Sequence, residues 1–256
     1  MGLVNSSRLC ALAIPAVLLS FGPRPPNSRP PKDVVGLPLV ELPTNRGQDL
    51  LAVLLTGDGG WAKGDQSMAS AFRARAISVI GFVSPSYLQV PRTPDGAGDD
   101  LRRVLDHYLH VWHRNRVIVV GYSRGADLLP FMVSRLPLEL RRRLALVAMI
   151  GLSDQASFQY RPTDIFADGL RFTDRPVRPE VEKLRGLRMM CISGERETGS
   201  LCPQLDSSLI RVARHAGGHR VTQRVGAAVV DLMLEEVPRG TPGLHSLRLR
   251  RRHQLI

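Results

Sequence analysis

The stretch VIVVGYSRG, residues 117–125, decides the fold of this chain. Its first four residues are apolar and β-branched, which suits a central parallel strand that is buried on both faces. The Gly-x-Ser-x-Gly pattern that follows is typical of a sharp turn from a strand into a helix, with a strained serine at its tip. Larger side chains would collide two positions before and after this serine. The stretch therefore predicts a nucleophile elbow with Ser123 as the nucleophile and Gly121 and Gly125 as the elbow glycines.

The segment after the predicted elbow has the periodicity of a buried helix. A chance Gly-x-Ser-x-Gly match lacks this context, so the helix strengthens the prediction. The apolar residues at helical spacing are Leu128, Leu129, Met132, Val133 and Leu136.

Strand and helix patterns alternate along the rest of the chain. This alternation indicates the α/β class and an α/β-hydrolase-like doubly wound, mostly parallel sheet, with its site above the carboxyl ends of the strands. A loop-rich region that extends to Pro179, with Phe158, Tyr160, Phe166 and Phe172, is expected to cap the site. Apolar runs predict strands at 50–56, 77–83, 144–152, 188–193 and 209–213 and an edge strand within 34–42, and helical spacing predicts helices at 65–76, 97–113 and 221–234.

Candidates for a base and an acid follow the serine along the chain. Serine attack needs a base that takes the hydroxyl proton and an acid that orients this base, and in this fold the chain order is serine, acid, histidine. His219 follows a Gly-Gly pair that would let its loop fold back over the elbow. Glu197 is the preferred acid, and Glu195 is the alternative. The other histidines fit less well, namely His107, His110, His113, His215, His245 and His253.

A glycine-rich turn, GDGG at residues 57–60, follows the strand predicted at 50–56. Glycines at the carboxyl end of a strand let backbone amides approach a ligand, and half of an oxyanion hole is built there in this architecture. A tight turn that needs positive φ is the plainer alternative. The expected oxyanion donors are the amide of Arg124 and an amide of Asp58 or Gly59.

Two further residues are candidates for substrate recognition. Trp61 directly follows the glycine-rich turn. Asp127 lies in the first turn of the predicted helix, where the helix dipole stabilises a carboxylate. For Asp127, a capping role stands beside recognition of an ammonium group on the substrate.

The 256 residues, of which 43% are hydrophobic, fit one α/β domain with tails. Arg8 precedes an apolar run that is too short to cross a bilayer comfortably, which is typical of a secretory signal. We expect residues 1–22 to be a signal peptide or an uncleaved anchor, residues 23–42 a Pro-rich linker with an edge strand, residues 43–238 the folded domain, and residues 239–256 a basic tail. Export from the cytoplasm follows from this organisation.

Two cysteines, Cys191 and Cys202, remain once the signal is removed; Cys10 is part of the apolar run. They lie on either side of a predicted strand end and loop, where a disulfide could hold the loop in an oxidising compartment. Two free cysteines are the alternative. The chain contains no C-x-x-C and its histidines are scattered, so we expect neither a zinc site nor a cofactor.

The net charge of +12 favours anionic surfaces such as phospholipid headgroups, although arginine-rich composition also arises from a GC-rich genome. Arginines concentrate at Arg141–Arg143 and near the C-terminus, at Arg248 and Arg250–Arg252. Nucleic acid is a poor candidate partner, because no nucleic-acid module is recognised and few aromatics accompany the cations.

Five motifs stand out along the chain: LTGDGGWA at 55–62, RTP at 92–94, GYSRGADLLP at 121–130, CISGERETGSLCP at 191–203 and GGH at 217–219. Together they resemble the VirJ/AcvB family of bacterial virulence proteins, and the resemblance covers roughly residues 50–234. It implies an exported α/β-hydrolase-fold protein of Gram-negative bacteria. Some members look like hydrolases of aminoacylated phosphatidylglycerol, especially the lysyl form, and others are associated with type IV secretion. The family's serine falls on Ser123, its acid on the Glu195/Glu197 pair and its Gly-Gly-His loop on His219.

The chain departs from the family pattern in two places. The family usually has two adjacent histidines and then phenylalanine, whereas Arg220 and Val221 follow His219 here, and residues 84–90 are poor in the expected aromatics. The leading hypothesis is a periplasmic serine esterase acting on an aminoacyl ester of an anionic phospholipid. The alternative is a non-catalytic accessory protein for secretion or virulence on a hydrolase scaffold.

Overall fold

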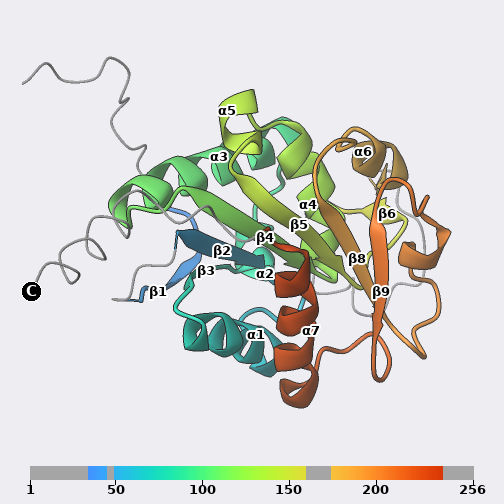
Figure 1. Cartoon of the computed structure of the whole chain (residues 1–256). Coiled ribbons are helices and arrows are strands. Elements are labelled where there is room, and N and C mark those ends of the chain that lie inside the picture. Colours follow the sequence, from blue (N-terminus) through green and yellow to red (C-terminus); the bar gives the residue numbers. More distant parts are fainter. Residues whose placement is uncertain (1–33, 45–48, 160–173, 239–256) are drawn as a thin grey trace, which may run out of the picture. The chain divides into compact units, whose positions relative to one another are not determined.

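The computed structural model describes residues 34–44, 49–159 and 174–238, and its main feature is a seven-stranded sheet in the order β1-β3-β2-β4-β5-β8-β9 (Figure 1). All neighbouring strands are parallel except β1, which pairs antiparallel with β3 at one edge. The expected α/β class and mostly parallel sheet are thus confirmed. The strands are β1 (Leu39–Leu42), β2 (Leu50–Leu55), β3 (Ser78–Phe82), β4 (Arg116–Tyr122), β5 (Leu144–Ile150), β8 (Met189–Gly194) and β9 (Arg211–His215).

Helices cover both faces of this sheet, as Figure 1 shows. On one face, α3 (Pro94–Val111) and α4 (Arg124–Ser134) pack against each other, and α6 (Arg178–Glu182) packs on α4. On the other face, α1 (Lys63–Ala74) packs along α7 (Gln223–Glu236). The short helices α2 (Ser84–Tyr87) and α5 (Leu138–Arg141) and the 3-10 turn η2 (Cys202–Gln204) lie in connections.

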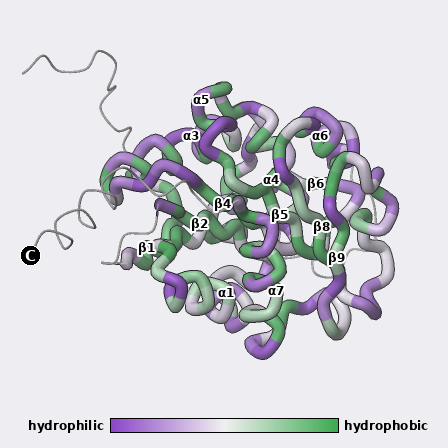
Figure 2. Tube along the Cα trace, viewed as in Figure 1, coloured by the Kyte–Doolittle hydropathy of each residue, from purple (hydrophilic) through white to green (hydrophobic). Residues whose placement is uncertain are grey.

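The central strands are buried on both faces because their residues alternate between two hydrophobic cores. On β2, Leu51 and Val53 belong to the core under α3 and α4, whereas Ala52 and Leu54 belong to the core under α1 and α7. Figure 2 shows the hydrophobic colour along the central strands. Each fully buried leucine or valine contributes about 1.5–3 kcal/mol to folding, so the continuous apolar runs stabilise the centre of the sheet.

Some predicted boundaries are wrong by a few residues. The last strand is Arg211–His215 instead of 209–213, because the amides of Leu209 and Ile210 donate to Asp206 O in a turn. Helix α3 begins at Pro94 instead of Ala97, since Thr93 Oγ1 caps it by accepting from Gly96 N at 3.0 Å.

The region between β5 and α6 contains a small two-stranded sheet that the sequence patterns did not predict. Strands β6 (Gln155–Ala156) and β7 (Arg175–Pro176) pair antiparallel. Of the aromatics expected to cap the site, Phe158 is buried edge-on against Phe131, with ring centroids 5.2 Å apart. Tyr160, Phe166 and Phe172 lie outside the described residues, as do the predicted signal at 1–22 and the tail at 239–256. No helix of the described part of the chain is long and apolar enough to span a membrane.

Candidate active site

Ser123 lies at the tip of the turn from β4 into α4, as the Gly-x-Ser-x-Gly pattern predicts. Its backbone has φ 51° and ψ −122°, a conformation that costs a non-glycine residue of the order of 1–3 kcal/mol. The Ser123 amide donates to Ile150 O at 2.8 Å, and the Ser123 carbonyl accepts from Ala126 N and Asp127 N in the first turn of α4. The surrounding structure therefore holds this strained residue in place.

Three glycines make room for the elbow. A Cβ on Gly121 would lie 2.4 Å from Gly125 O, and one on Gly125 would lie 2.3 Å from Leu55 O. Both distances are prohibitive, so the two predicted elbow positions require glycine. Gly57 serves the same purpose from β2, since a Cβ there would lie 3.0 Å from the Ser123 Cβ.

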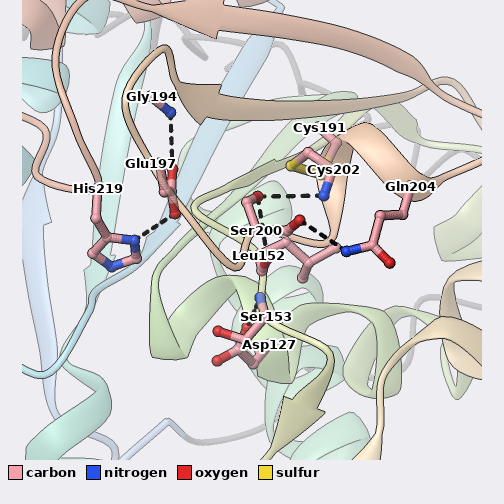
Figure 3. The surroundings of a disulfide bond; sticks show 10 residues. All are labelled: Asp127, Leu152, Ser153, Cys191, Gly194, Glu197, Ser200, Cys202, Gln204 and His219. Carbon is pink, nitrogen blue, oxygen red and sulfur yellow. Dashed lines mark hydrogen bonds and ion pairs between the residues drawn. A yellow bond between two sulfur atoms is a disulfide. The ribbon is translucent and has the colours of Figure 1, made fainter.

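Ser123, His219 and Glu197 form a chain of hydrogen bonds. His219 Nε2 lies 2.9 Å from Ser123 Oγ, and His219 Nδ1 lies 2.6 Å from Glu197 Oε1. Because a carboxylate accepts hydrogen bonds, Nδ1 carries the proton and Nε2 accepts from the serine hydroxyl. Glu197 is itself held, since its Oε2 accepts from Gly194 N at 2.8 Å (Figure 3). The three side chains have the geometry of a serine, base and acid triad.

The structure separates the two candidate acids. The Glu197 side chain is 5% exposed and contacts His219, whereas Glu195 is exposed and its amide donates to His215 O at 2.9 Å. Arg196 N donates to Gly217 O at 2.8 Å, which joins the acid loop to the histidine loop. A Cβ on Gly194 would lie 2.3 Å from Gly218 O, so the two loops are in direct contact there.

Two residues that support His219 were missed from the sequence. Gly151 has φ 65°, and a Cβ there would lie 2.7 Å from His219 Cε1. The Tyr122 ring stacks on the imidazole with centroids 5.8 Å apart, and its hydroxyl donates to His219 O at 3.4 Å and accepts from Val221 N at 3.3 Å. Tyr122 occupies the first variable position of the Gly-x-Ser-x-Gly pattern, and because any residue is allowed there, the pattern did not indicate its role. Gly151 follows a predicted strand, but nothing local marks it.

The predicted oxyanion donors lie on two elements that meet beside Ser123. Arg124 is the first residue of α4, and Asp58 and Gly59 are in the turn after β2. Gly60 N donates to Gly57 O at 3.0 Å, which closes this turn, while the amides of Asp58 and Gly59 have no acceptor among the described residues. The Arg124 guanidinium forms a two-point ion pair with the Asp58 carboxylate, through Nε to Oδ1 and through Nη2 to Oδ2 at 3.1 Å. The turn is thus fixed to the start of α4.

The two candidate recognition residues differ in their surroundings. Asp127 is buried in the first turn of α4, where the positive end of the helix favours a carboxylate, and its Oδ1 accepts from Ser153 N at 2.8 Å. Burial raises the pKa of the Asp127 carboxyl to about 8. The Trp61 ring is partly buried over Gly81 of β3, where a Cβ would lie 2.4 Å from its Cζ3 atom. Substrate recognition by either residue stays a prediction.

Cys191 and Cys202 form a disulfide with Cα atoms 5.3 Å apart. Cys191 lies in β8 and Cys202 opens η2, so the bond closes the loop that carries Glu197 (Figure 3). The alternative of two free thiols is wrong. Both cysteines are fully buried.

The remaining histidines of the described chain lie away from this arrangement. His107 and His110 are on α3, His113 follows that helix, and His215 is buried at the end of β9 with Nδ1 against Ala216 O at 3.0 Å. Among the described residues no group of three or more His, Cys, Asp or Glu side chains is placed to hold a metal ion. Arg220, at the position where the family has a second histidine, is exposed and follows the residue that contacts Ser123.

The sheet order, the strained serine at the end of the central strand and the serine–histidine–glutamate geometry define an α/β-hydrolase fold. The family model described as "Bacterial virulence protein (VirJ)" matches residues 49–240. The chain therefore belongs to the VirJ family of bacterial virulence proteins, as the resemblance of its motifs predicted.

Solved structures with the same fold include several hydrolases. An esterase of Pyrococcus furiosus matches with a TM-score of 0.55 at 16% identity, covering 84% of this chain and 94% of that one. Est1E from Butyrivibrio proteoclasticus matches with a TM-score of 0.54 at 12% identity, covering 80% and 97%. A lidless serine hydrolase of Xanthomonas campestris matches with a TM-score of 0.51 at 16% identity, covering 80% and 89%. These identities show the fold alone, and no curated protein matches the sequence.

Proposed function

We propose that this protein is an exported serine esterase that cleaves the aminoacyl ester of an anionic phospholipid such as lysyl-phosphatidylglycerol. The single observation that carries the catalytic part is the hydrogen-bond chain from Ser123 Oγ through His219 to Glu197, at 2.9 and 2.6 Å. Three side chains from distant parts of the sequence meet in the order and geometry that nucleophilic attack requires.

The reaction has two steps. Ser123 Oγ attacks the ester carbonyl while its proton moves to His219 Nε2, and Glu197 stabilises the resulting imidazolium. The tetrahedral oxyanion accepts hydrogen bonds from the amide of Arg124 and from that of Asp58 or Gly59. His219 returns the proton to the leaving lipid hydroxyl as the C–O bond breaks, leaving an acyl-enzyme. Water, deprotonated by His219, then releases the amino acid and regenerates Ser123.

The substrate class rests on the family resemblance and on charge. A net charge of +12 favours anionic headgroups, and each cation close to such a surface contributes about 1 kcal/mol of attraction. The cluster Arg141–Arg143 precedes the amino end of β5, whereas Ser123 follows the carboxyl end of the parallel strand β4. These arginines therefore lie at the amino ends of the strands, whereas Ser123 lies at their carboxyl ends. Arg196 and Arg220, both exposed on the two loops of the acid and the histidine, are the better placed cations.

Export is supported by the disulfide, because such bonds persist in oxidising compartments. The apolar run after Arg8 supports it independently.

The test is turnover by the mature protein on lysyl-phosphatidylglycerol in anionic vesicles and on simple p-nitrophenyl esters. Ser123→Ala is expected to lower kcat by at least about a thousandfold on both substrates. Turnover that does not depend on Ser123 on either substrate would disprove the catalytic proposal. Turnover of p-nitrophenyl esters alone would retain the esterase and reject the lipid.

A non-catalytic role as an accessory protein for secretion is the second candidate. Arg220 favours it, because the family usually has a second histidine at this position. A fluorophosphonate probe separates the two functions, since a competent triad is labelled covalently at Ser123 and an inactive scaffold is not. Mass spectrometry of the labelled peptide, with Ser123→Ala as the control, identifies the site.

A further inference from the structure

The segment 151–153, directly after β5, lies next to His219 and Glu197. A Cβ on Gly151 would lie 2.7 Å from His219 Cε1, 2.9 Å from Nδ1 and 3.4 Å from Glu197 Oε1. Gly151 therefore lies close to both partners of the 2.6 Å hydrogen bond, and a side chain there would collide with the imidazole. A shift of the segment would move the imidazole relative to Ser123.

The acid loop holds this segment from one side. Gly151 N donates to Ile192 O of β8 at 2.8 Å. Leu152 O accepts from Leu201 N at 2.8 Å and from the Ser200 hydroxyl at 3.4 Å, and both donors lie next to Cys202 of the disulfide (Figure 3). The segment and the Glu197 loop consequently form one hydrogen-bonded unit.

The nucleophile helix holds the segment from the other side through a single side chain. Asp127 lies one turn after Ser123 on α4, and its Oδ1 accepts from Ser153 N at 2.8 Å. Figure 3 shows the carboxyl of Asp127 below Ser153, with Leu152 and the acid loop beyond it. Asp127 is 9% exposed, so little water competes for this hydrogen bond.

We propose that Asp127 is a positioning residue that sets the distance between the nucleophile and the histidine–acid pair by holding Ser153. This inference rests on the proposed esterase function. The hydrogen bond to Ser153 links the helix that presents Ser123 with the segment that supports His219. Because a displacement of about 1 Å can cost about a hundredfold in rate, its loss should affect the chemical step more than substrate binding.

Three variants of the exported, disulfide-bonded protein test this role. Asp127→Leu removes the acceptor at similar volume, and Asp127→Asn keeps an acceptor oxygen without a charge. Glu180→Leu is the matched control, because Glu180 holds the other end of α4 by accepting from the Ser134 hydroxyl at 2.7 Å and from Arg135 Nη1 at 3.1 Å. Each variant removes or alters a buried carboxyl group that accepts a hydrogen bond from a different element of the fold.

The substrates are a neutral p-nitrophenyl ester and a lysine p-nitrophenyl ester. We expect Asp127→Leu to lower kcat about 10- to 100-fold on both esters with little change in KM, and Asp127→Asn to stay within about threefold of the wild type. Glu180→Leu should lower the thermal midpoint and leave kcat unchanged. A wild-type kcat for Asp127→Leu would overturn the inference. A rise in KM for the lysine ester alone, in both Asp127→Leu and Asp127→Asn, would also overturn the inference. It would show that Asp127 recognises the ammonium group.

Hydrogen exchange provides a readout that does not depend on turnover. Asp127→Leu should speed exchange at Ser153 and in the His219 loop, whereas Glu180→Leu should not. Unchanged exchange in Asp127→Leu overturns the positioning role even if the protein has no activity. Absence of fluorophosphonate labelling of the wild type rejects the proposed function instead, so the two failures are distinguishable.

Discussion

The nucleophile side and the histidine–acid side of the candidate site are held in place by different means. Ser123 is positioned by a contiguous stretch, in which glycines at 121 and 125 allow backbone segments to approach within distances that no side chain would permit. His219 and Glu197 lie on two loops joined by Arg196 N to Gly217 O, closed by a disulfide and backed by Gly151. The first side depends on steric exclusion and the second on long-range ties. Substitutions should therefore disrupt them in different ways.

The largest effect is expected on the nucleophile side. Gly125→Val places branched carbon where a Cβ alone would lie 2.3 Å from Leu55 O, in the centre of the sheet. The backbone must move to relieve this clash, so we expect a loss of more than about 4 kcal/mol of unfolding free energy. Urea denaturation followed by circular dichroism measures it. Gly186→Val is the control, since a Cβ there meets nothing within 4 Å although its φ of 93° adds strain. Equal losses for both variants would contradict the steric argument.

The next effect separates the two glutamates on the acid side. Glu197→Gln keeps the shape but removes the charge that orients and stabilises the imidazolium, and we expect kcat to fall about a thousand- to ten-thousandfold. Glu195→Gln should change kcat less than about twofold, because its side chain is exposed and the histidine contacts Glu197. Steady-state kinetics on a p-nitrophenyl ester decides between them. A greater loss of kcat for Glu195→Gln than for Glu197→Gln would show that Glu195, and not Glu197, is the acid.

A smaller effect is expected when the covalent tie on the acid side is removed. The disulfide closes a short loop with a sequence separation of 11, so Cys191→Ala/Cys202→Ala should lose about 3 kcal/mol of stability. Because Glu197 lies in this loop, removal of the disulfide should also lower kcat. In a Glu197→Gln background the same removal should leave kcat unchanged, and a double-mutant cycle measures this coupling. An equal fall in both backgrounds would mean that the bond stabilises the fold without positioning the acid.

The last effect concerns the link between the two sides and depends on pH. The pKa of Asp127 is raised from 3.8 to about 8, first by burial and also by the Asp58 charge, while Ser153 and Arg124 oppose the rise. Between pH 3.8 and about pH 8 the folded state retains a proton on Asp127 that the unfolded state has released. The stability that this group contributes is therefore fully present below pH 3.8 and decreases as the pH rises to about 8. Asp127→Asn should therefore gain stability relative to the wild type as pH rises over this range. Denaturation midpoints at pH 4, 6 and 8 test the trend, and a difference that is constant with pH would contradict it.

The comparison also explains which features could be predicted from the sequence. The elbow, its glycines and the central strands were predicted correctly because strand burial and tight turns are encoded in neighbouring residues. Ser123, Glu197 and His219 could be proposed from their order along the chain, with Glu195 left open. Gly151, the stacking of Tyr122 on His219 and the bond from Asp127 to Ser153 were missed, since each depends on a partner far away in the sequence.

The α/β class, the serine at the elbow and membership of the VirJ family could be inferred from residues 49–240 alone, because these features depend on local periodicity and on short motifs. The folded structure was needed to show that Glu197 contacts His219, that Asp127 accepts a hydrogen bond from Ser153, and that Arg141–Arg143 lie at the amino end of β5, away from Ser123. The physical reason is that a side chain's partner is set by how strands order and loops pack. Sequence distance carries little information about either.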